Sequence, residues 1–386
     1  MADDAEKLMY CKLESVAKEQ GYANYKTNVR ELNTGGANYT SRLYYVTLSA
    51  PGCPDLNLFA KIAVLSEKMR SKFPIEIYTN EILYYSHILK RYQEFEEKYC
   101  INTKHRLRSI KCYGYSNEYL KESLILEDLT PKGFTTLDRF LCVDWKYASR
   151  AVSELAKFHS LSVEFRLNFP EEFEKYKERF PLLFNEHFLK DFFDNHASKT
   201  YAAIKQENRQ RLVDFIKAQN FNFSKITTRC PVLAHGDFRH SNIMHKEIDN
   251  GELELIIVDY QGFQISSPLI DLMYFIILST DKEFRSQHYH QLLDHYYSEF
   301  CGSLKRLNID PDTVYTKDDF QHDIKLFEPY VVIMGTLILP GMSAFVENAQ
   351  NMENTEDRNV FEIEPCQIGS QRLNDLIDDF VELGVL

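Results

Sequence analysis

The spacing of hydrophobic and polar residues changes several times along the first 64 residues, and each change marks a different predicted element. Residues 4–20 have helical character, and Gly21 follows where helices often end. Residues 29–48 form two β-favouring runs joined by a Gly-Gly pair, a pattern typical of a hairpin. In residues 58–64 (LFAKIAV) a single lysine, Lys61, interrupts an apolar run that predicts a short strand.

A helix and two more strands complete this first part of the chain. Residues 75–97 repeat apolar positions at three- and four-residue spacing and carry acids in the first turns, which predicts a helix. Residues 109–116 and 123–129 follow as two predicted strands. We therefore expect residues 1–129 to form a small lobe with a mostly antiparallel sheet and one main helix.

After Leu129 the pattern becomes mainly helical, and residues 130–386 are expected to form a larger lobe. Residues 231–237 predict a strand that runs into a turn, and residues 242–259 predict a hairpin around an Asp-Asn-Gly turn. The fold class is thus α+β. The expected helices cover about 136–162, 170–219, a segment from about 268, 319–339 with a break at Pro329, and 371–383.

Composition and charge exclude some classes of protein. The chain has 386 residues, of which 44% are hydrophobic, so it can bury a substantial core. Its formal net charge of -12 argues against nucleic acid as a partner, because a broad phosphate-binding surface needs concentrated Lys and Arg. The eight cysteines show no CxxC pair and no zinc-type spacing, so we interpret them as reduced thiols.

Two stretches bear on membranes and location. The N-terminal sequence MADDAEKLMYCKLES carries acids where a secretory signal would carry bases, and no apolar stretch of the signal type follows it. The most apolar run, residues 330–339, is shorter than the roughly 20 residues that a bilayer crossing needs. We expect a cytoplasmic protein without a membrane-spanning segment.

The strongest candidate chemistry lies in residues 235–261. Asp237 and Asn242 stand five positions apart in HGDFRHSN, the spacing of the base and the metal-binding amide in a kinase-type catalytic loop. Asp259, at the end of the hairpin, would be the main carboxylate ligand of Mg²⁺. By itself this match is equally compatible with residues that cap turns. The strand and hairpin context favours function, and we interpret His235 as a structural residue that orients the loop.

Upstream residues supply the cation that a nucleotide site needs. Viewed alone, Lys61 would more often be a charge on an edge strand. With a metal and hydroxyl site downstream, it is similar to the strand lysine that contacts the phosphates of ATP in kinases. Its expected helical partner is Glu81, with Glu76 as the alternative one turn away.

Two further segments are candidates for nucleotide contacts. In the Gly-Gly turn, Gly36 and Asn38 can bring backbone N–H groups to a phosphate, and Ser41 could add a hydroxyl, although a plain hairpin turn is the alternative. Three residues between the lobes would offer backbone groups to the edge of an adenine: Glu127, Asp128 and Leu129.

Six motifs in this order resemble the ecdysteroid kinase-like family, which is related to choline and aminoglycoside kinases: GANYTS, FAKI, NEILYY, LILEDLTPKGF, HGDFRHSNIM and VDYQ. The similarity extends from about Gly21 to the C-terminal helix. It implies a two-lobed protein-kinase-like fold that uses ATP and Mg²⁺ to phosphorylate a hydroxyl of a small molecule, namely an ecdysteroid or a similar apolar compound.

By position, the resemblance implies that Asp237 is the base, Asn242 and Asp259 are metal ligands, Lys61 contacts the ATP phosphates, and Asp271 braces the catalytic loop. DYQG stands where protein kinases have DFG, and little room for peptide docking follows, so neither a protein substrate nor an obligate protein partner is expected. Two alternatives stay open. One is a choline or ethanolamine kinase, which would need an aromatic and acidic cage, and the other is a non-catalytic nucleotide or sterol binder.

Overall fold

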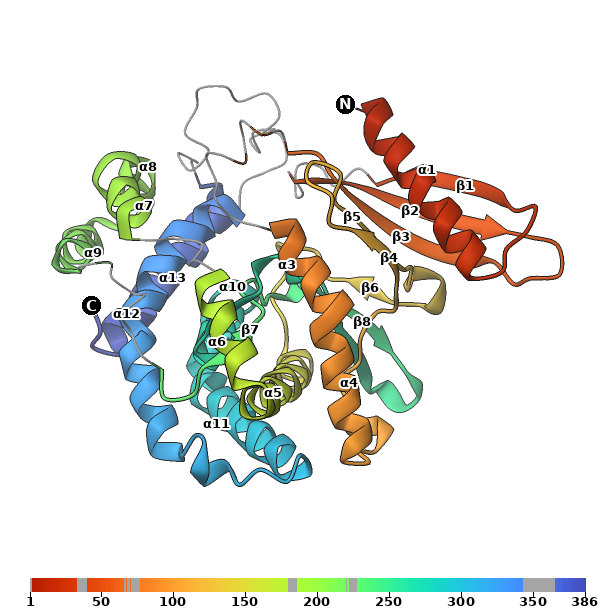
Figure 1. Cartoon of the computed structure of the whole chain (residues 1–386). Helices are drawn as coiled ribbons and strands as arrows, with labels where there is room; N and C mark the ends of the chain where they lie inside the picture. The colour runs from red at the N-terminus through yellow and green to blue at the C-terminus, as the bar shows by residue number, and fades with distance from the viewer. Residues whose placement is uncertain are drawn as a thin grey trace.

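The N-terminal part of the computed structural model is a five-stranded antiparallel sheet (Figure 1). The structure describes residues 2–32, 40–65, 67, 70, 77–179, 186–219, 221, 228–342 and 365–386. The strands lie in the order β1-β2-β3-β5-β4, and each neighbouring pair is antiparallel, which confirms the antiparallel sheet predicted from the sequence. Their bounds are β1 Lys26–Glu31, β2 Ser41–Ser49, β3 Leu56–Ala63, β4 Cys112–Ser116 and β5 Ser123–Glu127.

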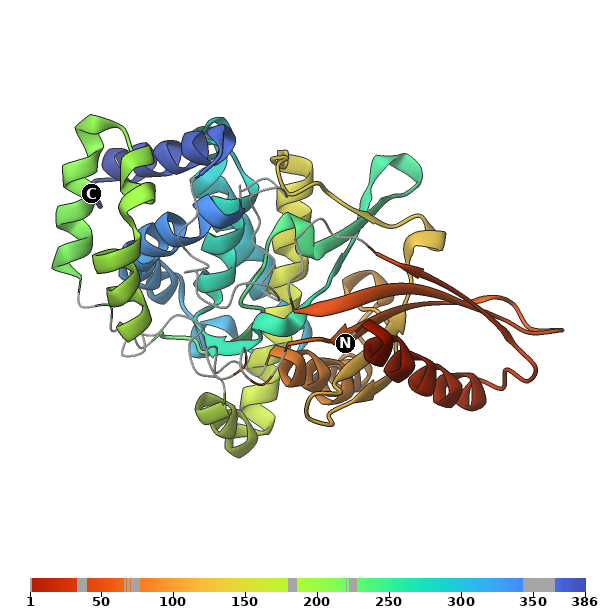
Figure 2. The ribbon, with the colours of Figure 1, turned by 90° about the horizontal axis from the view of Figure 1, so that it is seen from above.

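Helices lie against this sheet and beside it. Helix α1 (Ala2–Glu19) runs along the sheet in both views, and its Met9, Leu13 and Val16 are buried against strand residues in a small hydrophobic cluster (Figures 1 and 2). The predicted main helix consists of α3 (Ile77–Leu83), a π-helical turn η1 (Tyr84–Ile88) and α4 (Leu89–Lys98). Its apolar residues belong instead to the large core shared with the C-terminal helices.

The C-terminal part is mainly helical and is built around α5 (Trp145–Asn168), in which seventeen residues from Tyr147 to Phe165 are buried. Helix α11 (Lys282–Arg306) packs along α5. Together with the sheet, these helices confirm the α+β class with two lobes, while the boundary between residues 129 and 130 stays a prediction. The other helices are α6 Pro170–Arg179, α7 Glu186–Asp191, α8 Ser198–Ala203, α9 Gln206–Ala218, α10 Pro268–Ser279, α12 Lys317–Met342 and α13 Gln367–Glu382.

Two small sheets hold the loops that carry the candidate chemistry. Strand β7 (Val232–Ala234) pairs with β10 (Gln264–Ser266). Strands β8 (Ile243–Glu247) and β9 (Leu253–Ile257) form the predicted hairpin, and Asn250 in its turn has a φ of 74°. Because both sheets are short and antiparallel, the loops before β8 and after β9 end at the same edge.

The predicted start of the first long helix at residue 136 is wrong. Thr135 and Thr136 form the two-residue strand β6, which pairs with His245 and Met244 of β8. The helix begins only at Trp145, because the side chain of Asp144 accepts a hydrogen bond from the N–H of Tyr147 and caps the first turn.

The predicted break at Pro329 is also wrong, since α12 continues through both Pro329 and Pro340. Proline removes one helical hydrogen bond, so other contacts must stabilise this segment. Val332 and Ile333 are fully buried, and α12 packs against α10 and α13. By length and composition alone the segment Lys317–Gly341 could cross a membrane, but 61% of its apolar window is buried inside the protein, as in a core helix.

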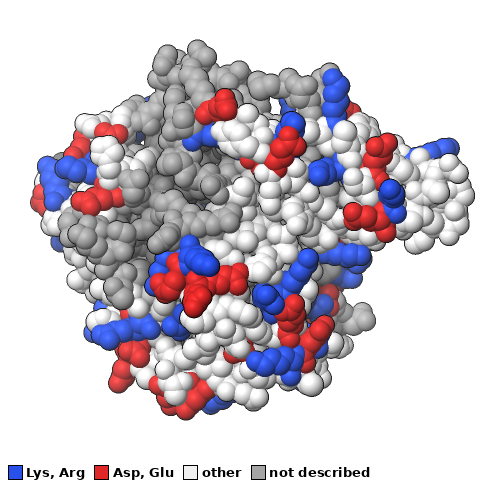
Figure 3. All heavy atoms as spheres, in the orientation of Figure 1, with Lys and Arg blue, Asp and Glu red and all other residues white. Residues whose placement is uncertain are grey.

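Charged side chains of both signs are mixed on the face of the molecule that Figure 3 shows. Among the described residues on this face, Lys and Arg lie next to Asp and Glu rather than gathering into one basic surface.

We predict that Gly335→Val lowers the midpoint of thermal unfolding by several degrees. A Cβ at Gly335 would lie 2.3 Å from Leu376 of α13 and 3.4 Å from Ile277 of α10, so overpacking is expected to cost about 1–3 kcal/mol. Gly302→Val in α11 is the control, because a Cβ there meets only the end of Arg306 at 3.6 Å. Equal melting temperatures of the two variants would contradict the close packing of α12 on α13.

Candidate active site

Lys61 connects three separate parts of the chain. It lies on the central strand β3, is 9% exposed, and its Nζ is 2.7 Å from Oε2 of Glu81 and 2.6 Å from Oδ1 of Asp259. Glu81 comes from α3 and Asp259 from the loop after β9. Of the two glutamates considered from the sequence, Glu81 is therefore the one beside Lys61, and Glu76 lies outside the described residues.

The charges of this cluster depend on one another. Burial lowers the pKa of Lys61, but Asp259 and Glu81 outweigh it, so the net shift of that pKa is upward. Burial raises the pKa of Glu81, and Lys61 offsets this only in part. Burial also opposes ionisation of Asp259, but Lys61 holds the pKa of this carboxyl below its usual value. One ammonium thus faces two carboxylates, and an additional cation is favoured there.

The backbone around Asp259 is held by an aromatic stack. Asp259 has a φ of 66°, a left-handed conformation that is uncommon for a residue with a Cβ. The next residue, Tyr260, stacks on Tyr84 of the π-helical turn with ring centroids 3.4 Å apart and planes 16° apart. Tyr84 lies three positions after Glu81, so one stretch of helix carries both the partner of Lys61 and the ring that stacks on Tyr260, the residue after Asp259.

Asp237 and Asn242 contact each other directly. Nδ2 of Asn242 donates to Oδ2 of Asp237 at 2.7 Å and to the carbonyl of the same residue at 2.9 Å. The carbonyl of Asn242 accepts from the N–H of Val258, which precedes Asp259. The start of β8 and the end of β9 therefore bring Asp237, Asn242 and Asp259 to one edge of the hairpin.

Asp271 of α10 holds the loop that precedes Asp237. Its two oxygens accept hydrogen bonds from the backbone N–H of His235 at 2.6 Å and of Gly236 at 2.8 Å, and His159 lies 3.0 Å from Oδ2. The ring of His235 is fully buried, with Nε2 2.9 Å from the carbonyl of Val258 and Nδ1 3.2 Å from the N–H of Asp237. Both ring nitrogens therefore lie against backbone groups of the two loops.

Two glycines allow the loop of residues 235–242 and the loop after Asp259 to touch. Gly236 has a φ of +81°, and a Cβ there would lie 2.0 Å from the carbonyl oxygen of Gly262. A Cβ on Gly262 would lie 3.0 Å from the backbone of Gly236 and of His235. The two loops approach so closely that neither position has room for a side chain.

The proposed nucleotide contacts are only partly described. Gly36 and Asn38 lie outside the described residues, whereas Ser41 is buried at the start of β2, opposite Ala63.

In the segment between the lobes, two backbone donors are already used. The N–H of Glu127 donates to Lys111 and that of Asp128 to Asn57. Among the described residues, the N–H of Leu129 has no acceptor, so it is the backbone donor of this segment that an adenine could engage.

The donor atoms around Asp259 suit a hard divalent cation. Both hydrogen bonds of the Asn242 side chain use Nδ2, which leaves its Oδ1 for a metal, and Lys61 engages only Oδ1 of Asp259. Oxygen ligands of this kind are those that Mg²⁺ prefers. No cluster of three or more His, Cys, Asp or Glu in the described residues could hold a metal by itself, so phosphate oxygens and water would have to complete the coordination.

One residue near Asp237 was not identified from the sequence. Nε of Arg239 donates to Oδ1 of Asp237 at 3.0 Å, and both side chains are 17% exposed. The signal available in the sequence is an arginine two positions after the candidate base, inside the loop that carries the motif. The two-residue spacing alone does not predict that the side chain of Arg239 turns toward Asp237.

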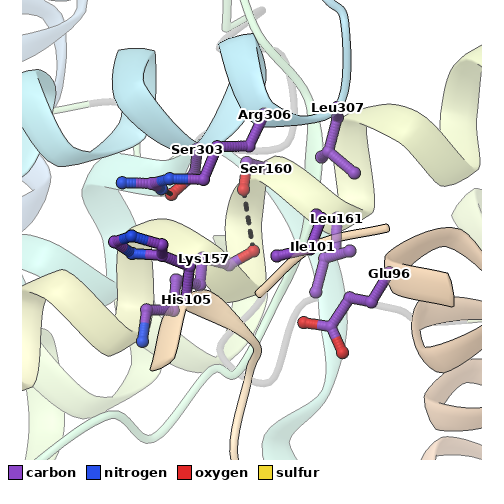
Figure 4. Close-up of a pocket in the computed structure, with 9 residues that line it drawn as sticks. All are labelled: Glu96, Ile101, His105, Lys157, Ser160, Leu161, Ser303, Arg306 and Leu307. Atoms are coloured by element: carbon purple, nitrogen blue, oxygen red, sulfur yellow. Dashed lines mark hydrogen bonds between the residues drawn. The ribbon is translucent and has the colours of Figure 1, made fainter. Parts of the chain in front are cut away.

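A small hollow lies outside this site, between α4, α5 and α11 (Figure 4). Glu96 points toward it, and Oε1 of Glu96 accepts from the N–H of Leu107 at 2.6 Å. Burial raises the pKa of Glu96 to about 7, although Leu107, Arg106 and Lys157 act in the opposite direction. The hollow is lined by Glu96, Ile101, His105, Lys157, Ser160, Leu161, Ser303, Arg306 and Leu307.

Comparison with known proteins identifies one family. The model of the ecdysteroid kinase-like family matches residues 35–309 of this chain. No curated protein matches it. Among solved structures, the GDP and kanamycin complex of APH(2")-IIia has 10% identity and a TM-score of 0.45, over 84% of this chain and 89% of that one. The GDP complex of wild-type aminoglycoside 2'-phosphotransferase-IIIa has 10% identity and a TM-score of 0.47, over 96% and 99%.

We predict that Gly236→Ala destabilises the protein more than Gly21→Ala does. Both glycines have positive φ, which costs an L-residue about 1–2 kcal/mol, but only at Gly236 would the new Cβ also collide with a backbone oxygen. Around Gly21 no described atom lies within 4 Å of the Cβ position. Denaturant unfolding of the two variants measures the difference, and equal losses of stability would show that the loop contact is not tight.

We predict that Glu96→Gln removes a pH dependence of stability. The folded protein keeps the Glu96 proton up to a pKa of about 7, whereas the unfolded chain releases it near the ordinary value of 4.5. Unfolding therefore releases a proton in this window, and the free energy of unfolding decreases as the pH rises through it. The stability gained by Glu96→Gln over wild type should be larger at pH 8 than at pH 5. Glu97→Gln, at the exposed next position, is the control, and parallel pH profiles of Glu96→Gln and wild type would refute the prediction.

Proposed function

This chain belongs to the ecdysteroid kinase-like family and is a small-molecule phosphotransferase, and from this premise we propose that it transfers the γ-phosphoryl group of ATP, with Mg²⁺, to a hydroxyl. The observation that supports this most is the bridge from Lys61 to Glu81 and Asp259, beside the contact between Asp237 and Asn242. Phosphoryl transfer needs a cation at the phosphates, oxygen ligands for the metal and a carboxylate at the attacking hydroxyl. These residues supply all three.

Each residue has one task in the proposed reaction. Lys61 donates to the nucleotide phosphates while Glu81 keeps its ammonium in place. Asn242 and Asp259 hold Mg²⁺, which when bound neutralises phosphate charge. Asp237 orients the acceptor hydroxyl and takes its proton as the new bond to phosphorus forms. Leu129 donates its backbone N–H to the adenine edge.

We propose an ecdysteroid or another apolar hydroxyl compound as the acceptor. Support comes from the family and from aromatic side chains near the proposed base. Tyr274 of α10 has its pKa raised by burial and further by Asp237, so this ring lies within electrostatic reach of the carboxylate, and Tyr330 of α12 adds to the same effect. A panel of sterols, plant phenolics, choline and ethanolamine, with mass-spectrometric detection of one added phosphate, would identify the acceptor.

We predict that Asp237→Asn lowers the turnover number of ATP-dependent phosphorylation at least about a hundredfold while leaving the Kd for Mg-ATP within a few fold of wild type. The variant is isosteric, and its amide oxygen can still accept the hydrogen bond from Asn242, although it loses the acceptor that Arg239 uses. Asp271 still holds the loop through two backbone N–H groups. Phosphorylated product is measured by mass spectrometry and nucleotide affinity by calorimetry.

The control is Asp318→Asn, an exposed acid in the first turn of α12, which should leave both quantities unchanged. Full turnover of Asp237→Asn would exclude Asp237 as the base. If wild-type protein binds Mg-ATP but phosphorylates no alcohol of the panel, the alternative of a non-catalytic nucleotide or sterol binder is correct.

A further inference from the structure

Arg239 is a mostly buried cation whose donors are largely unused. Its side chain is 17% exposed, and its one hydrogen bond in the described part of the chain runs from Nε to Oδ1 of Asp237 at 3.0 Å. A guanidinium carries five N–H groups, so four of them have no partner among these residues. None of these nitrogens is among the buried unpaired atoms of the described residues, so they face accessible space beside Asp237 and are free to bind a ligand there. This arrangement points to an anionic partner that binds at the site.

The position of Arg239 restricts which anion this is. Burial lowers the pKa of Arg239, but Asp237, Tyr274 and Asp259 outweigh it, and the net shift of the pKa is upward. The guanidinium is therefore within electrostatic reach of both the proposed base and the proposed metal carboxylate. In a phosphotransferase, the group that occupies the space between these two carboxylates is the phosphoryl group in transit.

Arg239 is not needed to hold Asp237 in place. Oδ2 of Asp237 already accepts from Asn242, and Asp271 already fixes the loop through two backbone N–H groups. Oδ1, the oxygen that Arg239 engages, is the one left to receive a proton from an acceptor hydroxyl. In this structure, Arg239 therefore occupies the oxygen that would accept the proton.

We propose that Arg239 binds the γ-phosphoryl group during transfer and leaves Asp237 when the nucleotide arrives. This inference rests on the proposed function and adds a residue to it. In the step, the acceptor oxygen forms a bond to phosphorus while the bond from phosphorus to the oxygen bridging to the β-phosphate breaks, and that oxygen keeps the electron pair. Asp237 takes the acceptor's proton, and the planar fork of Arg239 donates to two non-bridging oxygens of the phosphoryl group.

If Arg239 binds the phosphoryl group, it should strengthen the binding of Mg-ADP with a phosphoryl mimic but not the binding of Mg-ADP alone. The test compares the Kd of Mg-ADP with that of Mg-ADP plus aluminium fluoride, which imitates the planar phosphoryl group, by calorimetry on the full chain. Wild-type protein should bind the aluminium fluoride complex roughly a hundredfold more tightly. Arg239→Gln should lose at least about tenfold of this gain with the Kd of Mg-ADP within about threefold of wild type. Arg239→Lys should retain part of the gain, because it keeps the charge but not the fork.

Arg91→Gln is the matched control, since this arginine on α4 is paired with Glu94 at the surface and should bind both probes like wild type. Melting curves show whether each variant is folded. If Arg239→Gln is unfolded, the affinities of Arg239→Lys for the two probes are compared with those of wild type instead. A full gain in Arg239→Gln, or no gain in wild type, overturns the role of Arg239 but leaves the proposed function standing if Mg-ADP binds. Equal weakening of both probes shows a structural role and also overturns the inference. Absence of Mg-ADP binding to wild type overturns the proposed function itself.

Discussion

The buried bridge from Lys61 to Glu81 and Asp259 is the interaction on which the arrangement of the site depends. It joins the N-terminal sheet, the helix beside it and the loop after the β8–β9 hairpin at distances of 2.6 and 2.7 Å. Removing one member of such a cluster leaves an uncompensated charge in a buried place, which typically costs about 3–5 kcal/mol. The same cluster carries one positive and two negative groups. It therefore joins the three segments and also favours the binding of an additional cation.

Backbone contacts then set how the rest of the site faces this bridge. Asp271 accepts hydrogen bonds from two consecutive N–H groups, and Gly236 and Gly262 bring two loops into direct contact. The two loops are in direct backbone contact, and any side chain at Gly236 or Gly262 would push them apart. The stack of Tyr260 on Tyr84 fixes the residue that follows Asp259 against the helix that carries Glu81. Together, these contacts place Asp237 and Asp259 on rigid elements, as efficient transfer requires.

The charges on the catalytic loop explain how one site can be stable both with and without substrate. In this structure, the carboxylates of Asp237 and Asp259 are paired with Arg239 and Lys61, respectively. Phosphate groups offer the same two cations alternative partners, and a metal ion offers the same to Asp259. Binding would then exchange ion pairs rather than create unpaired charges, which keeps the desolvation penalty small.

The sequence by itself determined the types and order of the elements, the hairpin of residues 242–259, and the candidates Lys61, Glu81, Asp237, Asn242 and Asp259, because spacing along one strand, helix or loop encodes these locally. Only the tertiary structure decided which groups meet. It placed Glu81 against Lys61, directed Arg239 to Asp237, and stacked Tyr84 on Tyr260. It also overruled two local signals, since pairing with β8 delays the start of α5 and burial between α10 and α13 carries α12 through Pro329. In each case the outcome depends on residues distant in the chain, whose facing and burial no local spacing can specify.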